Sequence, residues 1–356
     1  MSGLDDVIAA ETTLSEVDGL NGRLVICGHR LDDLAGSTSY EGVLALLCAD
    51  LLGQGEGVIR TQLGAARLRA FAEIAHLDDD LLSLSITEGH RALMARLPDG
   101  EDAAIALLLT AAPAVFIPAL IRRKAGQDVI APDSTRSHAA DMLAMLTATE
   151  PSPAAIAALD TYLVTVSDHG LNASTFAARV VASTRAGYTS AVLAALGALK
   201  GPLHGGAPGP VLDMLDAVGS PENAKAFLSG ELERGERLMG FGHRIYRVRD
   251  PRADALKGAL QHLGAAGGMN ADRLALAETV EREALALLHI AKPDRKLETN
   301  VEFFTALLLE ALGFPRDAFT GVFATGRVGG WIAHAHEQVA KGRLIRPQSK
   351  YIGKAA

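Results

Sequence analysis

The sequence predicts an all-α protein with one small β-hairpin near its N-terminus. Of its 356 residues, 49% are hydrophobic but only 4% are aromatic, and alanine and leucine occur throughout. Helices favour alanine and leucine, whereas β-sheets draw on aromatic and β-branched residues. Apolar residues also recur every three or four positions along much of the chain, which is the spacing of one helix face.

The predicted hairpin covers residues 16–26. The turn-forming pairs Asp18-Gly19 and Asn21-Gly22 precede the apolar run Leu24-Val25-Ile26. Everything after it is expected to form helices and loops. The clearest helical patterns cover residues 40–52, 62–76, 141–149, 153–166, 173–186 and 303–312.

One long apolar stretch invites comparison with a membrane span. Residues 103–121 carry no charge and are followed by Arg122-Arg123-Lys124, a positive flank of the kind found beside membrane helices. Pro113 and Pro118 interrupt this stretch, and alanines are frequent in it. We therefore expect two short buried helices here and no membrane contact.

Charge and cysteine content exclude several classes of protein. The 34 basic and 42 acidic residues give a net charge of −8, and no basic face with interleaved aromatics predicts nucleic-acid binding. Cys27 and Cys48 cannot form a disulfide framework and lack zinc-ligand spacing. Residues 1–18 are acidic and lack the apolar core of a secretory signal. A reducing cytoplasm is the expected compartment.

The segment His334-Ala335-His336-Glu337 carries residue types that often bind metals. On a helix, however, residues two apart point to different faces. We therefore expect no metal site there.

Histidines and one carboxylate recur in order along the chain. They lie in Ser167-Asp168-His169, around His204 in residues 201–207, around His243 in residues 240–252, and at Glu302. Carbon–carbon bond formation from a thioester needs a base for an α-proton and donors for two carbonyl oxygens. This series supplies both. Glycine and proline also crowd at residues 200–210 and 313–315, so the segment between is expected to be a small inserted domain with a cleft beside His204.

The chain resembles the citrate synthase family through several stretches in the family's order. They are residues 40–43, 168–169 with 171–176, 201–207, 240–246 with 250–252, 300–303, 326–334 and 346–347. No single stretch is decisive, but together they cover nearly the whole chain in a specific order and spacing.

The resemblance implies an all-α homodimer with two domains in each subunit. The large domain would comprise residues 1–204 plus 313–356, the small domain residues 205–312, and the active site the cleft between them. The implied reaction condenses acetyl-CoA with oxaloacetate and hydrolyses the thioester to citrate and CoA. The alternative within the family is 2-methylcitrate synthase, which uses propionyl-CoA.

By resemblance, three residues are catalytic. His204 would donate a hydrogen bond to the thioester oxygen, His243 would polarise and protonate the oxaloacetate carbonyl, and Glu302 would remove the methyl proton. His169, Arg252, Arg327 and Arg346 would bind oxaloacetate, since a planar guanidinium can hold a carboxylate at two points. Arg346 would reach the active site of the partner subunit.

The resemblance also locates the CoA site. Arg247 would contact a phosphate, and the loop with Leu238, Gly240 and Gly242 would lie near the adenine. The glycine-rich runs lack the spacing of dinucleotide or P-loop fingerprints. No cofactor beyond the CoA thioester substrate is expected.

Three departures from the family pattern stand out. Glu302 replaces the usual aspartate, and a misplacement of about 1 Å can cost on the order of 10²-fold in rate. Gly170 stands where glutamate is common, and Cys27-Gly28-His29 where arginine, glycine and an aromatic residue are common. These departures motivate a second hypothesis of another class, a catalytically weak paralogue that binds CoA or a dicarboxylate.

Overall fold

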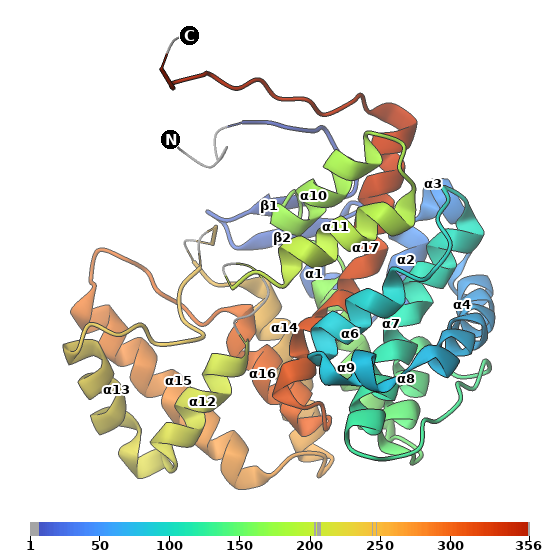
Figure 1. Cartoon of the computed structure of the whole chain (residues 1–356). Helices are drawn as coiled ribbons and strands as arrows, with labels where there is room; N and C mark the ends of the chain where they lie inside the picture. The colour runs from blue at the N-terminus through green and yellow to red at the C-terminus, as the bar shows by residue number, and fades with distance from the viewer. Residues whose placement is uncertain (1–6, 203, 205–207, 244, 247, 355–356) are drawn as a thin grey trace.

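The computed structural model describes residues 7–202, 204, 208–243, 245–246 and 248–354 (Figure 1). The strands are β1 (Ser15–Asp18), β2 (Arg23–Ile26) and β3 (His29–Arg30). The α-helices are α1 (Leu31–Leu34), α2 (Tyr40–Leu47), α3 (Ala49–Leu52), α4 (Glu56–Phe71), α5 (Asp79–Ser83), α6 (Ile86–Met94), α7 (Ala103–Lys124), α8 (His138–Thr147), α9 (Pro153–Val166), α10 (Ala173–Ala182), α11 (Tyr188–Leu199), α12 (Pro208–Val218), α13 (Ala224–Glu233), α14 (Pro251–Ala265), α15 (Ala271–Ala291), α16 (Val301–Ala311) and α17 (Phe319–Lys341). Short 3₁₀ segments are η1 (Ala72–His76), η2 (Pro221–Asn223) and η3 (Arg316–Ala318).

The all-α prediction and the N-terminal hairpin are confirmed. Strands β1 and β2 pair antiparallel, with Ser15 opposite Ile26, and β3 adds a third short strand to β2. In the turn, Oδ1 of Asp18 accepts hydrogen bonds from the backbone N–H groups of Leu20 and Asn21. Gly22 follows with φ +61°, a left-handed conformation that favours glycine.

Most predicted helices exist, and their ends differ from the prediction by a few residues. The helix predicted over residues 153–166 is confirmed as α9, whose first turn is capped by the Ser152 hydroxyl. The pattern over 40–52 breaks at Cys48 into α2 and α3. The pattern over 62–76 begins earlier, at Glu56, and its last part is the 3₁₀ segment η1.

The prediction of two short helices in residues 103–121 is wrong, because one continuous helix, α7, spans them. Pro113 and Pro118 lie inside it, and each removes a backbone donor at a cost of about 3 kcal/mol. Every residue from Ile105 to Leu120 is buried, and α7 packs against α4, α6, α8 and α17. This burial offsets the proline cost.

Helix α7 also satisfies the length and composition of a membrane-crossing helix, and it alone does so in the described part of the chain. The protein itself buries 83% of its most apolar window. A mostly buried core helix passes the same test, so length and composition are weak signs of a membrane span.

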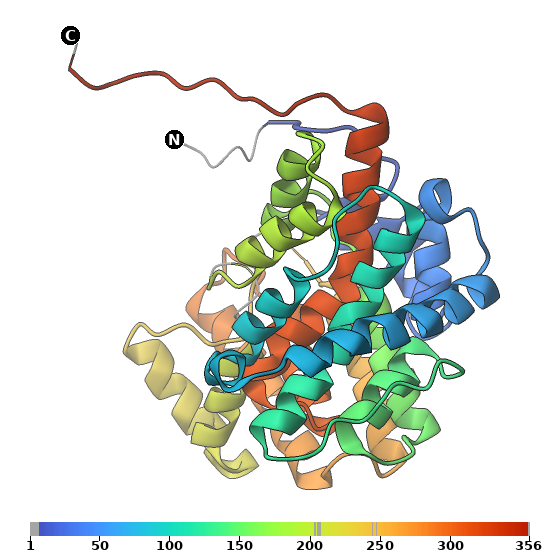
Figure 2. The same cartoon turned by 45° about the vertical axis from the view of Figure 1, so that its right-hand side comes forward.

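Helix α17 runs through the middle of the helical body (Figure 2). It packs against α2, α7, α9, α10 and α11, and its Trp331 is the largest fully buried side chain among the described residues. The extended segment after α17 leads away from this body, on the same side as the N-terminal segment (Figures 1 and 2).

Helices α12, α13 and α15 gather at one side of the molecule (Figure 1). Between them and the rest, α14 and α16 pack against each other and against α9, and α16 also contacts α12. The predicted chain breaks are present, since α11 ends at Leu199, α12 begins at Pro208 and α16 ends at Ala311. The division into domains at 204/205 and 312/313 stays a prediction, and residues 205–207 lie outside the described part.

Candidate functional site

Two predicted histidines and one predicted arginine lie in a single cluster around Tyr246. The Tyr246 hydroxyl lies 3.1 Å from Nε2 of His169, and the ring of His243 packs 4.9 Å from the phenol ring, centroid to centroid. The rings of His169 and His243 are 6.0 Å apart. The Arg252 guanidinium lies 5.6 Å from the centre of the phenol ring. Residues from the end of α9, from the loop before α14 and from α14 itself therefore meet here.

The hydrogen bonds of His243 define which ring nitrogen carries its proton. The backbone N–H groups of Ile245 and Tyr246 donate to Nδ1 at 3.0 and 3.1 Å. The proton of the neutral ring is therefore on Nε2. Nη2 of Arg252 lies 3.0 Å from this Nε2. Both atoms are donors, so an acceptor oxygen supplied by a ligand would satisfy the two together.

Burial keeps the imidazoles of the site neutral. Burial and the charge of Arg252 lower the pKa of His243 to about 4. Burial and the charge of Arg327 lower the pKa of His204 to about 4. Burial also lowers the pKa of His169 well below its usual value. At neutral pH each ring is therefore an uncharged hydrogen-bond donor and acceptor.

The two predicted carboxylate-binding arginines of the site are buried in different ways. Arg252 is held by Asp250, which accepts from its Nε and Nη2. Arg327 is 1% exposed, its Nε donates to the carbonyl of Val166, and its guanidinium lies 4.8 Å from the ring centre of Phe323. No carboxylate of a described residue lies within ion-pair distance of Arg327.

Burying a cation without a carboxylate at ion-pair distance is costly. Burial lowers the pKa of Arg327 to about 10, so it still carries its charge at neutral pH. An anionic ligand would remove the cost. Arg327 is therefore suited to bind a carboxylate that arrives from outside.

Glu302 lies in the first turn of α16. The Asn300 side chain caps this helix by accepting from the Glu302 backbone N–H at 3.0 Å, and its amide donates to the carbonyl of Gly242 at 2.8 Å. The side chain of Glu302 is half-buried, and no described residue donates a hydrogen bond to its carboxylate. Burial, countered in part by Arg252, raises its pKa to about 7.

His204 is held by a serine hydroxyl at the start of α10. Its Nε2 lies 2.8 Å from Oγ of Ser174. The Trp331 indole N–H, which can only donate, bonds the same Oγ at 3.1 Å, and Oδ1 of Asn172 lies 2.8 Å from it. The Ser174 hydroxyl donates to Asn172 Oδ1, which also accepts two backbone N–H groups of α10, so the oxygen that contacts His204 is held in place by the start of this helix.

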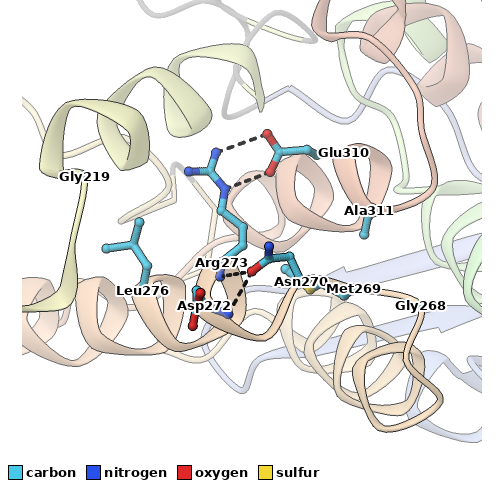
Figure 3. Close-up of a pocket in the computed structure, with 9 residues that line it drawn as sticks. All are labelled: Gly219, Gly268, Met269, Asn270, Asp272, Arg273, Leu276, Glu310 and Ala311. Carbon is cyan, nitrogen blue, oxygen red and sulfur yellow. Dashed lines mark hydrogen bonds and ion pairs between the residues drawn. The ribbon is translucent and has the colours of Figure 1, made fainter.

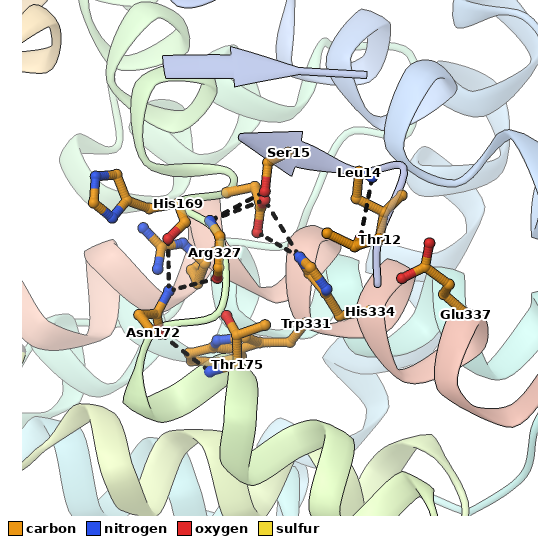
Figure 4. Close-up of polar contacts among 12 residues, drawn as sticks. Thr12, Leu14, Ser15, His169, Asn172, Thr175, Arg327, Trp331, His334 and Glu337 are labelled. Carbon is orange, nitrogen blue, oxygen red and sulfur yellow. Dashed lines mark hydrogen bonds and ion pairs between the residues drawn. The ribbon is translucent and has the colours of Figure 1, made fainter. Parts of the chain in front are cut away.

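The backbone before His169 is anchored by a buried ion network (Figure 4). Nε of Arg179 donates to Nδ1 of His334 at 3.1 Å, so Nε2 of His334 carries the proton and contacts Asp168 at 3.2 Å. Burial alone would raise the pKa of Asp168, but His334 and Arg327 hold it below its usual value. Asp168 thus stays charged and fixes the loop that carries His169.

Two of the departures from the family pattern lie in left-handed turns. Gly170 has φ +60° and Cys27 has φ +48°. The Gly170 backbone N–H donates to the Ser15 hydroxyl at 3.1 Å. The left-handed backbone explains glycine at position 170, and Tyr246, rather than residue 170, contacts the His169 ring.

The segment His334-Ala335-His336-Glu337 serves polar contacts within the chain. Glu337 binds Arg179, and the Tyr188 hydroxyl lies 2.8 Å from Nδ1 of His336. In the described part of the chain, no group of three or more His, Cys, Asp or Glu side chains is placed to hold a metal ion.

The predicted CoA loop borders a basic pocket of about 230 Å³. Gly242 donates through its N–H to the carbonyl of Glu298. Gly240 has φ +87°, and a Cβ there would lie 2.8 Å from the Phe303 side chain. Both glycines therefore permit close packing of this loop on the segment before α16. The pocket lining includes Leu238, Gly242 and His243, and three cations, Arg237, Lys292 and Arg295.

These three cations carried no role in the prediction. Arg237 and the other two are more than 50 positions apart in the chain, and neither segment has a distinctive motif. Ser174, Tyr246 and Asp250 were likewise given no role, although each lies within or beside a stretch that carries the resemblance. Arg247 lies outside the described residues.

Arg346 does not join the other predicted site residues. It is exposed on the extended segment after α17, which leads away from the helical body (Figures 1 and 2). Ile345 is tied to Ser183, whose Oγ accepts its backbone N–H at 3.0 Å.

A larger pocket lies elsewhere, at the N-terminal end of α15 (Figure 3). It has a volume of about 540 Å³ and contains none of the predicted site residues. Two of its charged groups, Arg273 and Glu310, are paired with each other, since Arg273 donates to both carboxylate oxygens of Glu310 at 2.9 and 3.1 Å. Size alone therefore does not locate the active site.

Comparisons with known proteins agree over the whole chain. The family model "Citrate synthase, C-terminal domain" matches residues 3–348. The citrate synthase of Haloferax volcanii is 38% identical and covers 99% of this chain and 95% of its own. A putative citrate synthase 2 of Mycobacterium tuberculosis is 37% identical, with 99% and 92% covered. The crystal structure of Thermotoga maritima citrate synthase superposes with a TM-score of 0.85 at 31% identity, covering 99% and 96% of the two chains. Citrate synthase of Thermoplasma acidophilum, solved as a ternary complex with carboxymethyl coenzyme A and oxaloacetate, gives a TM-score of 0.86 at 26% identity, covering 99% and 96%.

Proposed function

Because the chain belongs to the citrate synthase family, whose members are acyltransferases, we propose that it condenses acetyl-CoA with oxaloacetate and hydrolyses the product thioester to citrate and CoA. The observation that carries this proposal is the buried, unpaired guanidinium of Arg327 beside a cluster of neutral histidines and Arg252. A small dicarboxylate with a polarisable carbonyl matches this set of donors.

Oxaloacetate supplies what the cluster lacks. One carboxylate pairs with Arg327. The ketone oxygen lies beside His243 and Arg252 and accepts from Nε2 of one and Nη2 of the other, two nitrogens that are 3.0 Å apart. His169 contributes a further neutral donor to a substrate carboxylate, and its orientation is set by Tyr246.

The chemistry follows from the protonation states. The Glu302 carboxylate removes a proton from the methyl group of acetyl-CoA, and the electron pair moves to the thioester oxygen, which accepts a hydrogen bond from His204. The enolate carbon attacks the ketone carbon and the thioester carbonyl forms again. The π bond of the ketone breaks, and its oxygen takes the proton of His243, a loss that the proton taken up by Glu302 balances. Neutral imidazoles suit both donations, because the oxygens they serve become strongly basic. Water then cleaves the thioester and releases the CoA thiol.

Glu302 fits the role of base in one further respect. Its pKa of about 7 is close to neutral pH, where a general base combines a charged fraction with proton affinity. The usual aspartate is shorter by one methylene, and the half-buried position of Glu302 gives its longer side chain room to adjust.

The CoA moiety is assigned to the pocket beside residues 238–243. Arg237, Lys292 and Arg295 line it, and three cations suit the phosphate groups of CoA. The loop joins this pocket to the proposed base, since the Asn300 backbone N–H donates to the Gly240 carbonyl at 2.9 Å. CoA bound here would have its thioester end directed toward His243 and Glu302.

The proposed test measures CoA thiol release by the purified protein with oxaloacetate and either acetyl-CoA or propionyl-CoA. Faster turnover of acetyl-CoA supports citrate synthesis, and faster turnover of propionyl-CoA supports the 2-methylcitrate reaction. One methylene in an apolar pocket is worth only about 1–3 kcal/mol, so some activity with both is expected. Thiol release with neither, or unchanged release by Glu302→Gln, would contradict the proposed reaction and favour a binding role.

A further inference from the structure

A tyrosine with no role in the mechanism above has a buried and unused hydroxyl. Tyr162 lies in α9 and is 0% exposed, and its Oη has no hydrogen-bond partner among the described residues. Buried phenols usually find a partner, because leaving one unpaired costs free energy. The hydroxyl is therefore free to donate to an acceptor on a neighbouring helix.

The surroundings of Tyr162 place it beside the proposed site. Val166, one turn further along α9, accepts the hydrogen bond from Nε of Arg327, and α9 packs against both α16 and α17. Glu302 and Arg327 are the charged residues that act on the phenol electrostatically. Burial, aided by Glu302, raises the pKa of Tyr162 well above its usual value, so the hydroxyl keeps its proton and remains a donor.

The carboxylate of the proposed base, Glu302, lacks a hydrogen-bond donor among the described residues. A base, however, must be held within about 1 Å of its working position. Glutamate has one more rotatable bond than aspartate, so an unrestrained Glu302 would lose orientation. A donor on the neighbouring helix, combined with this longer reach, would restore it.

We propose that Tyr162 is a positioning residue whose hydroxyl donates a hydrogen bond to the Glu302 carboxylate when the acyl thioester is bound. The inference rests on the proposed function, in which Glu302 is the base. It gives the orphaned hydroxyl an acceptor and the unrestrained carboxylate a donor. It also explains how a glutamate can serve where one methylene of extra length would otherwise misplace the base.

The principal test is Tyr162→Phe, which removes the hydroxyl and keeps the ring. We expect kcat to fall about 10-fold, with the KM for oxaloacetate unchanged. A hydrogen bond to the charged form lowers a carboxyl pKa, so its loss should move the acidic limb of the kcat–pH profile upward by about one pH unit. Tyr188→Phe is the matched control, because the Tyr188 phenol contacts His336 instead and its loss should change neither quantity.

A second variant separates positioning from folding. In Glu302→Asp the carboxylate is withdrawn from Tyr162 by one methylene, so adding Tyr162→Phe to it should cost little further activity. The inference would be overturned if Tyr162→Phe changed neither kcat nor the acidic limb of the kcat–pH profile. It would also be overturned if the fold losses of kcat in Tyr162→Phe and Glu302→Asp simply multiplied in the double variant. A raised KM for oxaloacetate with an unmoved limb would also overturn it and place the hydroxyl on the oxaloacetate. Failure of the proposed function is recognised separately, because Glu302→Gln would then retain turnover.

Discussion

Asp250 binds the Arg252 guanidinium through two hydrogen bonds, from Nε at 3.0 Å and from Nη2 at 2.9 Å. The same carboxylate accepts the backbone N–H of Val301 at 3.3 Å, at the start of the helix that carries Glu302. One buried side chain therefore fixes both an arginine of the proposed oxaloacetate site and the helix of the proposed base. Binding of oxaloacetate and removal of the methyl proton are therefore both expected to depend on the Asp250 side chain.

Replacing Asp250 with asparagine should impair both steps. The amide keeps one acceptor oxygen but removes the charge that compensates the buried guanidinium, so the free energy of unfolding should fall by about 3 kcal/mol. The KM for oxaloacetate should rise by about 10-fold, and kcat should fall as well. Asp254→Asn is the control, since Asp254 is exposed on the same helix. Equal KM values for oxaloacetate in the two variants would contradict the inference that Asp250 positions the oxaloacetate site.

Removal of the Ser174 hydroxyl should affect the thioester half of the reaction. Ser174→Ala deprives His204 of the contact that holds its ring in place, so kcat should fall by about 10-fold or more. The KM for oxaloacetate should change little, because Ser174 contacts none of the residues proposed to bind that substrate. Steady-state kinetics with each substrate varied in turn measures the split. Ser190→Ala, whose hydroxyl contacts Asp99 instead, is the control.

The pH dependence of kcat/KM should report on Glu302. Its pKa is raised to about 7, chiefly by burial, and only the carboxylate form can accept the methyl proton. The rate should therefore rise with pH and level off above about pH 7. His204 and His243, whose pKa values are lowered to about 4, are already neutral near pH 7. Their titration should therefore not change the rate in this pH range. A rate that stays constant from pH 8 down to pH 5.5 would contradict Glu302 as the base.

The sequence predicted local structure where local chemistry decides it. Helix α9 is confirmed because the Ser152 cap and the proline at its start define its N-terminus. Helix α7 was predicted wrongly because its prolines are compensated by burial against several other helices, and no local pattern reveals that burial.

The site was predictable to a similar degree. The order of motifs identified His169, His243 and Arg252, which the structure brings together. The residues that orient them were not predictable, because those contacts join distant positions. The Ser174 hydroxyl and the Trp331 indole, for example, are 157 residues apart in the chain.

A histidine outside the site should limit stability in acid. His90 in α6 is 0% exposed, and both of its ring nitrogens lack partners among the described residues. Burial lowers its pKa to about 4, so between pH 6.5 and 4 the unfolded chain binds a proton that the folded protein does not. The free energy of unfolding should therefore decrease on acidification, by about 2 kcal/mol from this group between pH 8 and pH 5.

Denaturant unfolding of His90→Leu at these two pH values measures that contribution. The variant removes two unpaired polar atoms and the proton linkage together. The free energy of unfolding of the variant minus that of the parent should therefore be about 2 kcal/mol larger at pH 5 than at pH 8. An offset that is the same at both pH values would show that His90 does not take part in the acid dependence.

The exposed position of Arg346 leads to a prediction about assembly. If the chain is a homodimer in which Arg346 completes the partner's site, Arg346→Ala and His243→Ala should each be nearly inactive alone. Co-expressed, they form hybrid dimers in which one site combines an intact His243 cluster with an intact Arg346 from the partner. Random pairing should then restore about one quarter of the parental activity.

A matched mixture provides the control for this complementation. His243 and Glu302 are both proposed to act in the site of their own subunit. In a hybrid of His243→Ala with Glu302→Gln, each site therefore lacks one of the two residues and no activity should return. Recovery in the Arg346 mixture but not in this one would require Arg346 to act across the interface. No recovery in the Arg346 mixture, with hybrid dimers verified by differential tags, would mean that the arginine serves its own subunit. The extended segment after α17 would then have to fold back onto the helical body that it leaves in this structure.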